Sequence, residues 1–80
     1  MSQAKYWIFL YSKSMLKIGE RIRIARKEKG IAQEKLADML GIKQNRVSAW
    51  ELGYYEPSAD MIRQIAIALG CDANFLFDMD

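Results

Sequence analysis

Residues 30–53 read GIAQEKLADMLGIKQNRVSAWELG, and two short amphipathic patterns lie within this stretch. Apolar residues recur at helical spacing over residues 33–40 and again over residues 44–52, with only a short connection between the two patterns. Gly41 and Gly53 come directly after the patterns, where a left-handed C-terminal cap favours a residue without Cβ. We therefore expect two short helices joined by a tight turn.

Both of these helices lack a good N-terminal cap. Ala32 and Lys43 stand where Ser, Thr, Asp or Asn would accept a hydrogen bond from the first turn, which costs about 1 kcal/mol at each start. Each helix then opens with a glutamine, Gln33 or Gln44. The free backbone N–H groups and the positive dipole end at such a start can bind a phosphate in place of a cap.

Three more helices are expected around this pair. They cover about residues 17–29, the stretch from an N-cap at Ser58 to Leu69, and a last short segment capped by Asp72. The sequence therefore predicts an all-α domain of five helices over residues 17–80. The side chains expected to face its core are those of Ile18, Ile22, Ala25, Leu36, Ala37, Leu40, Val47, Trp50, Met61, Ile62, Ile65, Ala66, Leu69, Phe75 and Leu76.

The charges are distributed unevenly along the 80 residues, although the net charge is only +2. Ten Lys and Arg residues face four Asp and Glu residues between Lys13 and Arg46, whereas one Arg faces six acidic residues between Val47 and Asp80. A basic first half favours a polyanion as partner. Solvated helix faces of opposite sign are the alternative interpretation.

Several function classes find little support in the composition. The chain has no histidine and a single cysteine, Cys71, which excludes an internal disulfide and a zinc site of the usual Cys/His kind. We interpret Cys71 as a small buried hydrophobe. Without histidine, a glycine-rich phosphate loop or paired carboxylates, an enzyme is poorly supported, and we expect no cofactor, no metal and no small-molecule effector.

The longest apolar run, residues 6–11, is far shorter than the roughly 20 residues of a membrane span and makes a poor secretory signal. We therefore expect a cytoplasmic protein without a membrane partner.

Polar residues on the outer side of the second short helix are typical of a helix-turn-helix. The N-terminal half of such a helix enters the major groove, where Gln and Asn pair with adenine, Arg with guanine, and Ala touches the thymine methyl group. The candidates for base contact are Gln44, Asn45, Arg46, Ser48 and Ala49. Gln33 and Lys43 are the candidates for phosphate contact, and a generic polar helix face is the alternative.

Residues 18–76 closely resemble the phage-repressor-like helix-turn-helix family, also called Cro/C1-type or XRE. The resemblance rests on QEKLA, Gly41, VSAWE, Gly53, EP and IAIALG at the family's spacing. It implies a five-helix, lambda-repressor-like domain that binds operator DNA. It also implies an ion pair between Arg26 and Glu51, and DNA contacts by the residues Gln33, Gln44, Asn45 and Ser48.

From this resemblance we expect a sequence-specific regulator of transcription that binds double-stranded DNA, most simply a homodimeric repressor of phage or mobile-element type. An antitoxin-like protein or a protein-interaction module with the same fold is the alternative. Leu52, Tyr54 and Tyr55 stand where the family often has Asn, Lys or Arg near the phosphate backbone. The two tyrosine hydroxyl groups can still donate to phosphates, or the rings can simply cover the core.

Residues 1–16 depart from the helical pattern, and Met15 could even be the natural start. The stretch KYWIFLY is β-branched and aromatic in character and predicts a strand. Alternate side chains would point to opposite faces, which leaves no polar face for water. We therefore expect a dimerisation arm that pairs with its symmetry mate or packs on a partner domain near Ile24, a disordered tail being the alternative. The residues of this arm are Tyr6, Trp7, Ile8, Phe9, Leu10 and Tyr11.

Overall fold

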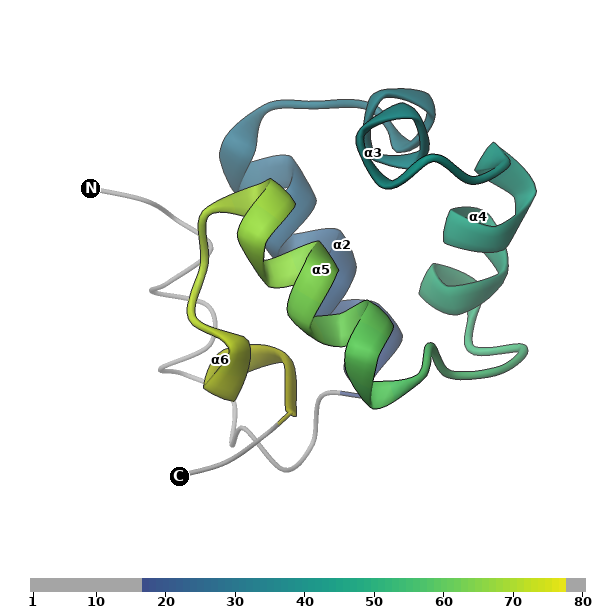
Figure 1. Cartoon of the computed structure of the whole chain (residues 1–80). Coiled ribbons are helices and arrows are strands. Elements are labelled where there is room, and N and C mark those ends of the chain that lie inside the picture. Colours follow the sequence, from purple (N-terminus) through teal and green to yellow (C-terminus); the bar gives the residue numbers. More distant parts are fainter. Residues whose placement is uncertain (1–16, 78–80) are drawn as a thin grey trace.

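Residues 17–77 are described by the structure, a computed structural model, and they form five α-helices and no strand (Figure 1). This confirms the all-α class. The predicted ends of the first four helices agree with the observed ones to within a residue, and the last helix begins directly after the predicted cap at Asp72. In chain order the helices are α2 (Ile18–Lys29), α3 (Gln33–Leu40), α4 (Gln44–Leu52), α5 (Ala59–Leu69) and α6 (Ala73–Phe77).

The helices α2 and α5 contact each other along the middle of the molecule, with α3 and α4 on one side and α6 on the other (Figure 1). Their apolar faces meet in one core, as the helical spacing predicts. Four of the expected core residues, Ile18, Leu40, Met61 and Phe75, are only partly buried at its edge. The buried hydrophobic residues are Ile22, Ala25, Leu36, Ala37, Val47, Trp50, Ile62, Ile65, Ala66, Leu69 and Leu76.

Side chains cap the starts of the last two helices, as the sequence predicts. The Ser58 Oγ atom accepts a hydrogen bond from the backbone N–H of Met61 at 3.1 Å, in the first turn of α5. An Oδ1 atom of Asp72 accepts one from the N–H of Asn74 at 2.9 Å, in α6. Each bond satisfies a backbone donor that the helix itself leaves unpaired.

Gly19 allows α2 to cross α4 at very short range. A Cβ atom built at this position would lie 1.9 Å from the carbonyl oxygen of Trp50, closer than any real contact. The backbones of the two helices therefore meet directly at this point, and the contact helps to position α4 relative to α2.

Arg21 is fully buried, which the sequence pattern does not predict. Its Nη1 atom donates a hydrogen bond to the carbonyl oxygen of Phe75 at 2.8 Å, and its guanidinium lies 5.6 Å from the centre of the Phe75 ring. This residue therefore joins α2 to α6 through both polar and cation–π contacts.

The predicted arm of residues 6–11 lies outside the described residues. Within residues 17–77 no helix is long and apolar enough to cross a membrane.

Candidate nucleic-acid interface

The helices α3 and α4 are joined by a turn of three residues, Gly41 to Lys43. Gly41 adopts a left-handed conformation with φ of 71°, which a residue with a side chain rarely takes. The N–H of Ile42 then donates to the carbonyl oxygen of Ala37 at 3.0 Å. The N–H of Gly41 donates to the carbonyl oxygen of Asp38 at 3.2 Å. The two bonds end α3, and the chain turns sharply into α4, which is the geometry of a helix-turn-helix.

No side chain caps the start of α3 or of α4. Ala32 and Lys43 have extended backbone at these positions, and both are exposed. Gln44 and Asn45, the first two residues of α4, are also exposed. In the first turn of α4 the N–H of Arg46 donates to the carbonyl oxygen of Lys43 at 3.1 Å. The first-turn N–H groups that have no such partner can donate to an acceptor from outside the protein.

The other two outward candidates on α4 are Ser48 and Ala49, and both are partly buried. They lie one turn after Gln44 and Asn45, at the spacing that places residues on the same side of a helix. The side opposite to them holds Val47 and is fully buried in the core. The structure thus places the polar N-terminal half of α4 at the surface.

Arg26 and Glu51 form a bidentate ion pair between α2 and α4. The Nε–Oε2 distance is 2.7 Å and the Nη2–Oε1 distance is 3.0 Å, and the two side chains are only 9% and 3% exposed. The remaining Nη1 atom of Arg26 donates to the carbonyl oxygen of Ile31 at 2.8 Å. Both charges are therefore compensated inside the domain, and the pair joins α2, α4 and the loop before α3.

A chain of amide hydrogen bonds connects this ion pair to the surface. The Nε2 atom of Gln33 donates to Oε1 of Glu51 at 3.0 Å. The Nε2 atom of Gln44 in turn donates to Oε1 of Gln33 at 3.4 Å. The glutamines that open α3 and α4 therefore lie side by side. The bond to Glu51 orients the amide group of Gln33, and Gln33 in turn accepts the bond from Gln44. The ion pair agrees with the one that the family resemblance implies, whereas the two amide hydrogen bonds were not predicted from the sequence.

Arg46 lies over the aromatic ring of Trp50, with its guanidinium 5.7 Å from the ring centre. The indole ring is buried at 1% exposure, and its Nε1 atom has no hydrogen-bond partner. The ring therefore offers its π face to the cation and otherwise packs as an apolar group. Among the base-contact candidates, Arg46 differs in having this partner within its own helix.

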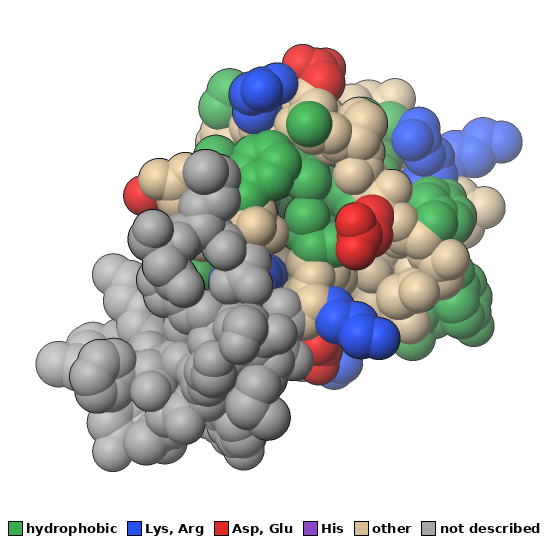
Figure 2. All heavy atoms as spheres, turned by 90° about the horizontal axis from the view of Figure 1, so that it is seen from below, with side chains coloured by type: hydrophobic (Ala, Val, Ile, Leu, Met, Phe, Trp, Pro, Cys, Tyr) green, Lys and Arg blue, Asp and Glu red, His purple; other side chains and the backbone are tan. Residues whose placement is uncertain are grey.

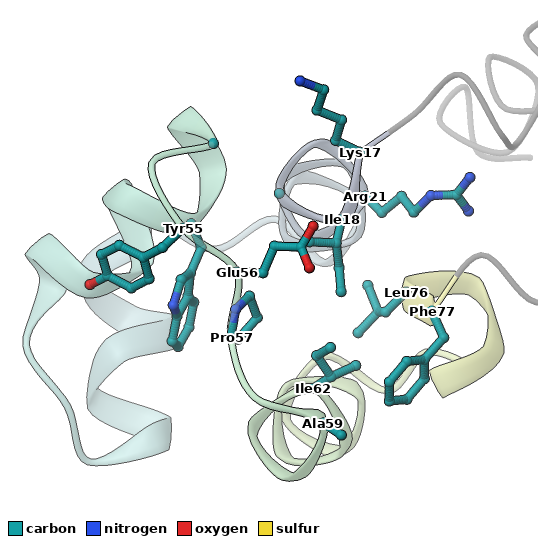
Figure 3. A pocket seen from close by; sticks show the side chains of 13 residues that line it. Lys17, Ile18, Arg21, Tyr55, Glu56, Pro57, Ala59, Ile62, Leu76 and Phe77 are labelled. Carbon is teal, nitrogen blue, oxygen red and sulfur yellow. The ribbon is translucent and has the colours of Figure 1, made fainter.

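The two tyrosines after α4 occupy different surroundings. Tyr54 is 76% exposed directly after the end of α4. Tyr55 is 50% exposed and lines a groove that also involves α2, α5 and α6, as Figure 3 shows. Leu52, at the last position of α4, is 63% exposed. Of the two tyrosines predicted to contact phosphate, only Tyr54 does not line that groove.

We also searched residues 17–77 for metal-ligating and reactive side chains. No group of three or more His, Cys, Asp or Glu residues lies close enough to hold a metal ion in that part of the chain. Cys71 is a free, half-buried cysteine packed against the core, and burial raises the pKa of its thiol above the usual value. A raised pKa keeps the thiol neutral, in agreement with its interpretation as a small hydrophobe.

The sequence is similar to those of known helix-turn-helix proteins. The sequence profile of the helix-turn-helix family matches residues 22–76. The prophage-derived uncharacterized HTH-type transcriptional regulator YonR of Bacillus subtilis is 33% identical, and the alignment covers 78% of this chain and 64% of that protein. Repressor protein C2 of Salmonella phage P22 is 35% identical, with 79% of this chain and 29% of the repressor covered. The chain thus spans less than two thirds of the length of either relative.

The fold is also similar to a solved repressor structure. The crystal structure of the P22 c2 repressor protein in complex with a synthetic operator superposes with a TM-score of 0.73 and 34% sequence identity. The superposition covers 81% of this chain and 98% of that chain.

Proposed function

This chain belongs to the helix-turn-helix family, and we propose that it is a sequence-specific DNA-binding regulator of transcription that acts as a homodimeric repressor in the cytoplasm. The observation that carries the proposal is the chain of hydrogen bonds from the buried pair Arg26–Glu51 through Gln33 to Gln44. It holds a glutamine amide at the exposed start of α4, where a recognition helix meets base edges.

The amide of Gln44 keeps the groups that an adenine edge requires. One of its two N–H donors bonds to Gln33, which leaves the second N–H and the carbonyl oxygen. A glutamine reads adenine by donating to N7 and accepting from the N6 amino group. Because Gln33 already fixes the amide plane, less conformational freedom is lost when the base is bound.

Neighbouring residues on α4 extend this reading of the major groove. Asn45 is exposed beside Gln44 and has the same pair of amide groups. Ser48 and Ala49 lie one turn further along, where a hydroxyl group can bond to a base and a methyl group can touch thymine. Arg46 would have to leave the face of Trp50 to reach guanine, so we assign it the weakest base preference of the five.

Phosphate contacts would come from the open helix starts. The uncapped N–H groups of α3 and α4 and the cation of Lys43 favour an anion at the same place. Gln33 has a second amide N–H besides the one that it donates to Glu51. The hydroxyl group of Tyr54 supplies a further donor after α4.

A repressor that acts as a homodimer would place two copies of α4 in successive major grooves. The centres of such half-sites are about 34–36 Å apart on DNA, and the operator is then palindromic. The relatives named above carry the names of a repressor and of a transcriptional regulator, which supports this role.

Selection of bound duplexes from a random-sequence pool, followed by fluorescence titration, tests the proposal. We expect a palindromic site, and Gln44→Ala should lose about 1–3 kcal/mol of discrimination at one position of each half-site. Gln64→Ala is the matched control, because Gln64 is an exposed glutamine of α5 that bonds to Asp60 instead. The absence of duplex binding at low salt would overturn the proposal.

A further inference from the structure

A groove of about 660 Å³ opens at the end of the domain away from α3. Figure 3 shows side chains that surround it from α2, from the loop between α4 and α5, and from α5 and α6. The floor is apolar, and Pro57, Ile62 and Leu76 in it are buried, whereas Ile18 and Phe77 at its sides are partly buried. Figure 2 shows this end of the molecule, with hydrophobic side chains across the middle of the face.

The groove has the size of a binding site, with an apolar floor and charged side chains (Lys17, Arg21 and Glu56) in its lining. Cavities that hold drug-sized molecules measure roughly 300–1,000 Å³ and are mostly apolar. The helix-turn-helix interface proposed above uses none of the residues that line it, apart from the buried Trp50 and the adjacent Tyr55. The groove is therefore free to bind something other than DNA.

The chain itself supplies a segment of matching chemistry at the edge of this groove. Lys17 lines the groove, and residues 1–16 join the domain at Lys17. The apolar run of residues 6–11 ends six residues before Lys17, so an extended connection keeps Tyr11 within about 20 Å of Lys17. The run can therefore reach the groove from its point of attachment.

The shape of the groove also suits the pattern of the run. Alternate side chains of an extended segment point to opposite faces, and residues 6–11 are apolar or aromatic on both. A flat surface would cover only one of these faces. A groove can cover both, because Figure 3 shows side chains around it from α2 above, from α5 below, from the α4–α5 loop on the left and from α6 on the right.

We propose that residues 6–11 bind in the groove of their own chain and complete the core at this end of the domain. Trp7 then lies in an apolar environment in the monomer. Pairing of this segment between two copies, as the sequence pattern alone suggested, is the outcome that the test must distinguish.

The test uses acrylamide quenching of the two tryptophans, Trp7 and Trp50, in the full chain. Trp50 is buried at 1% exposure and serves as the internal standard for protection. We expect both tryptophans to be protected, at every protein concentration. An exposed Trp7 in the unsubstituted chain would overturn the proposal, as would a protection that grows with protein concentration.

Ala59→Glu places a carboxylate in the groove without removing core packing, because Ala59 is exposed and lines the groove. Glu is also favourable at the start of α5. We expect this variant to expose Trp7 and raise its quenching constant several-fold. Asn74→Glu is the matched control in the first turn of α6, exposed and not in the lining. Unchanged protection in Ala59→Glu, or an equal effect of Asn74→Glu, would contradict the proposal.

A second measurement does not depend on a variant that folds. Nuclear Overhauser effects in the unsubstituted chain should connect the indole protons of Trp7 to the methyl groups of Ile62 or Leu76. Their absence, with the indole signals of Trp7 assigned, would also overturn the proposal.

Discussion

The helix starts at the two ends of this domain are built differently. At α5 and α6, Ser58 and Asp72 each accept a first-turn hydrogen bond, at 3.1 and 2.9 Å. At α3 and α4, Ala32 and Lys43 accept none through their side chains. Each missing cap costs about 1 kcal/mol. Lys17, before α2, makes no side-chain cap either, but there Glu20 accepts a hydrogen bond from the Lys17 N–H at 2.9 Å. The two starts on the face for which we propose DNA binding are those at which neither kind of capping bond forms.

The interior compensates for the open starts. The ion pair Arg26–Glu51 and the close approach of Gly19 to Trp50 hold α4 from the side of the core. A recognition helix can thus be rigid although its first turn is unsatisfied. The comparison teaches that α3 and α4 are positioned by their packing, whereas α5 and α6 are also fixed at their starts by caps.

Removal of one member of the ion pair should have the largest effect. Glu51→Ala leaves the guanidinium of Arg26 buried without its carboxylate, and we expect a loss of about 3–5 kcal/mol in the free energy of unfolding. The double substitution with Arg26→Ala should cost less than the sum of the two single changes. Urea denaturation of all three variants measures this coupling. Glu56→Ala, at an exposed glutamate, is the control and should change stability by less than about 0.5 kcal/mol. Small additive losses in the single variants would show that the pair does not hold α4.

A methyl group at Gly19 should have the next largest effect. Gly→Ala usually stabilises a helix interior by roughly 0.5–1 kcal/mol, but here the new Cβ atom would lie 1.9 Å from the Trp50 carbonyl oxygen. We expect Gly19→Ala to lose about 1–3 kcal/mol instead, because α2 and α4 must move apart. DNA affinity should fall with it. A stabilised protein in thermal melting would show that the crossing is not tight.

Removal of a cap at α5 and addition of one at α4 should have smaller effects on stability, and these effects should be opposite in sign. Ser58→Ala should lose about 1 kcal/mol of stability, and Lys43→Ser should gain about as much by supplying a cap. After correction for the folded fraction, DNA affinity should be unchanged in the first variant and reduced in the second. Calorimetry and DNA titration of the same samples measure both. A Lys43→Ser protein that gains stability and keeps its full DNA affinity would show that the uncapped start of α4 does not serve DNA binding.

The sequence alone predicted most of this fold because glycines and capping residues delimit each helix. Gly41 and Gly53 end α3 and α4 with positive φ, and Ser58 and Asp72 begin the last two helices. These are local signals, and they depend on a few adjacent residues. The amphipathic spacing then predicted which faces pack inward, apart from four residues at the edge of the core.

Features that depend on how the helices cross could not be predicted from local sequence signals. Arg21 is of a residue type that usually lies at the surface, and here it is buried, with its guanidinium bonded to the carbonyl oxygen of Phe75 in α6. Gly19 contacts a residue more than thirty positions away. The two glutamines were recognised as candidates by their place at the helix starts. Their bonds to each other and to Glu51 depend on the angle between α3 and α4.

The dependence of DNA affinity on salt tests the central claim most directly, because its slope counts the phosphates that cationic side chains neutralise, and Lys43 is the cation at the open start of α4. Titrations at several salt concentrations should compare the unsubstituted chain with Lys43→Ala and with Ser58→Ala. We predict that Lys43→Ala weakens specific and non-specific binding alike and flattens the slope of log affinity against log salt by about one unit. Ser58→Ala should leave the slope unchanged. An equal slope for all three proteins, or no binding to duplex DNA at low salt, would contradict the assignment of α3 and α4 as the DNA interface.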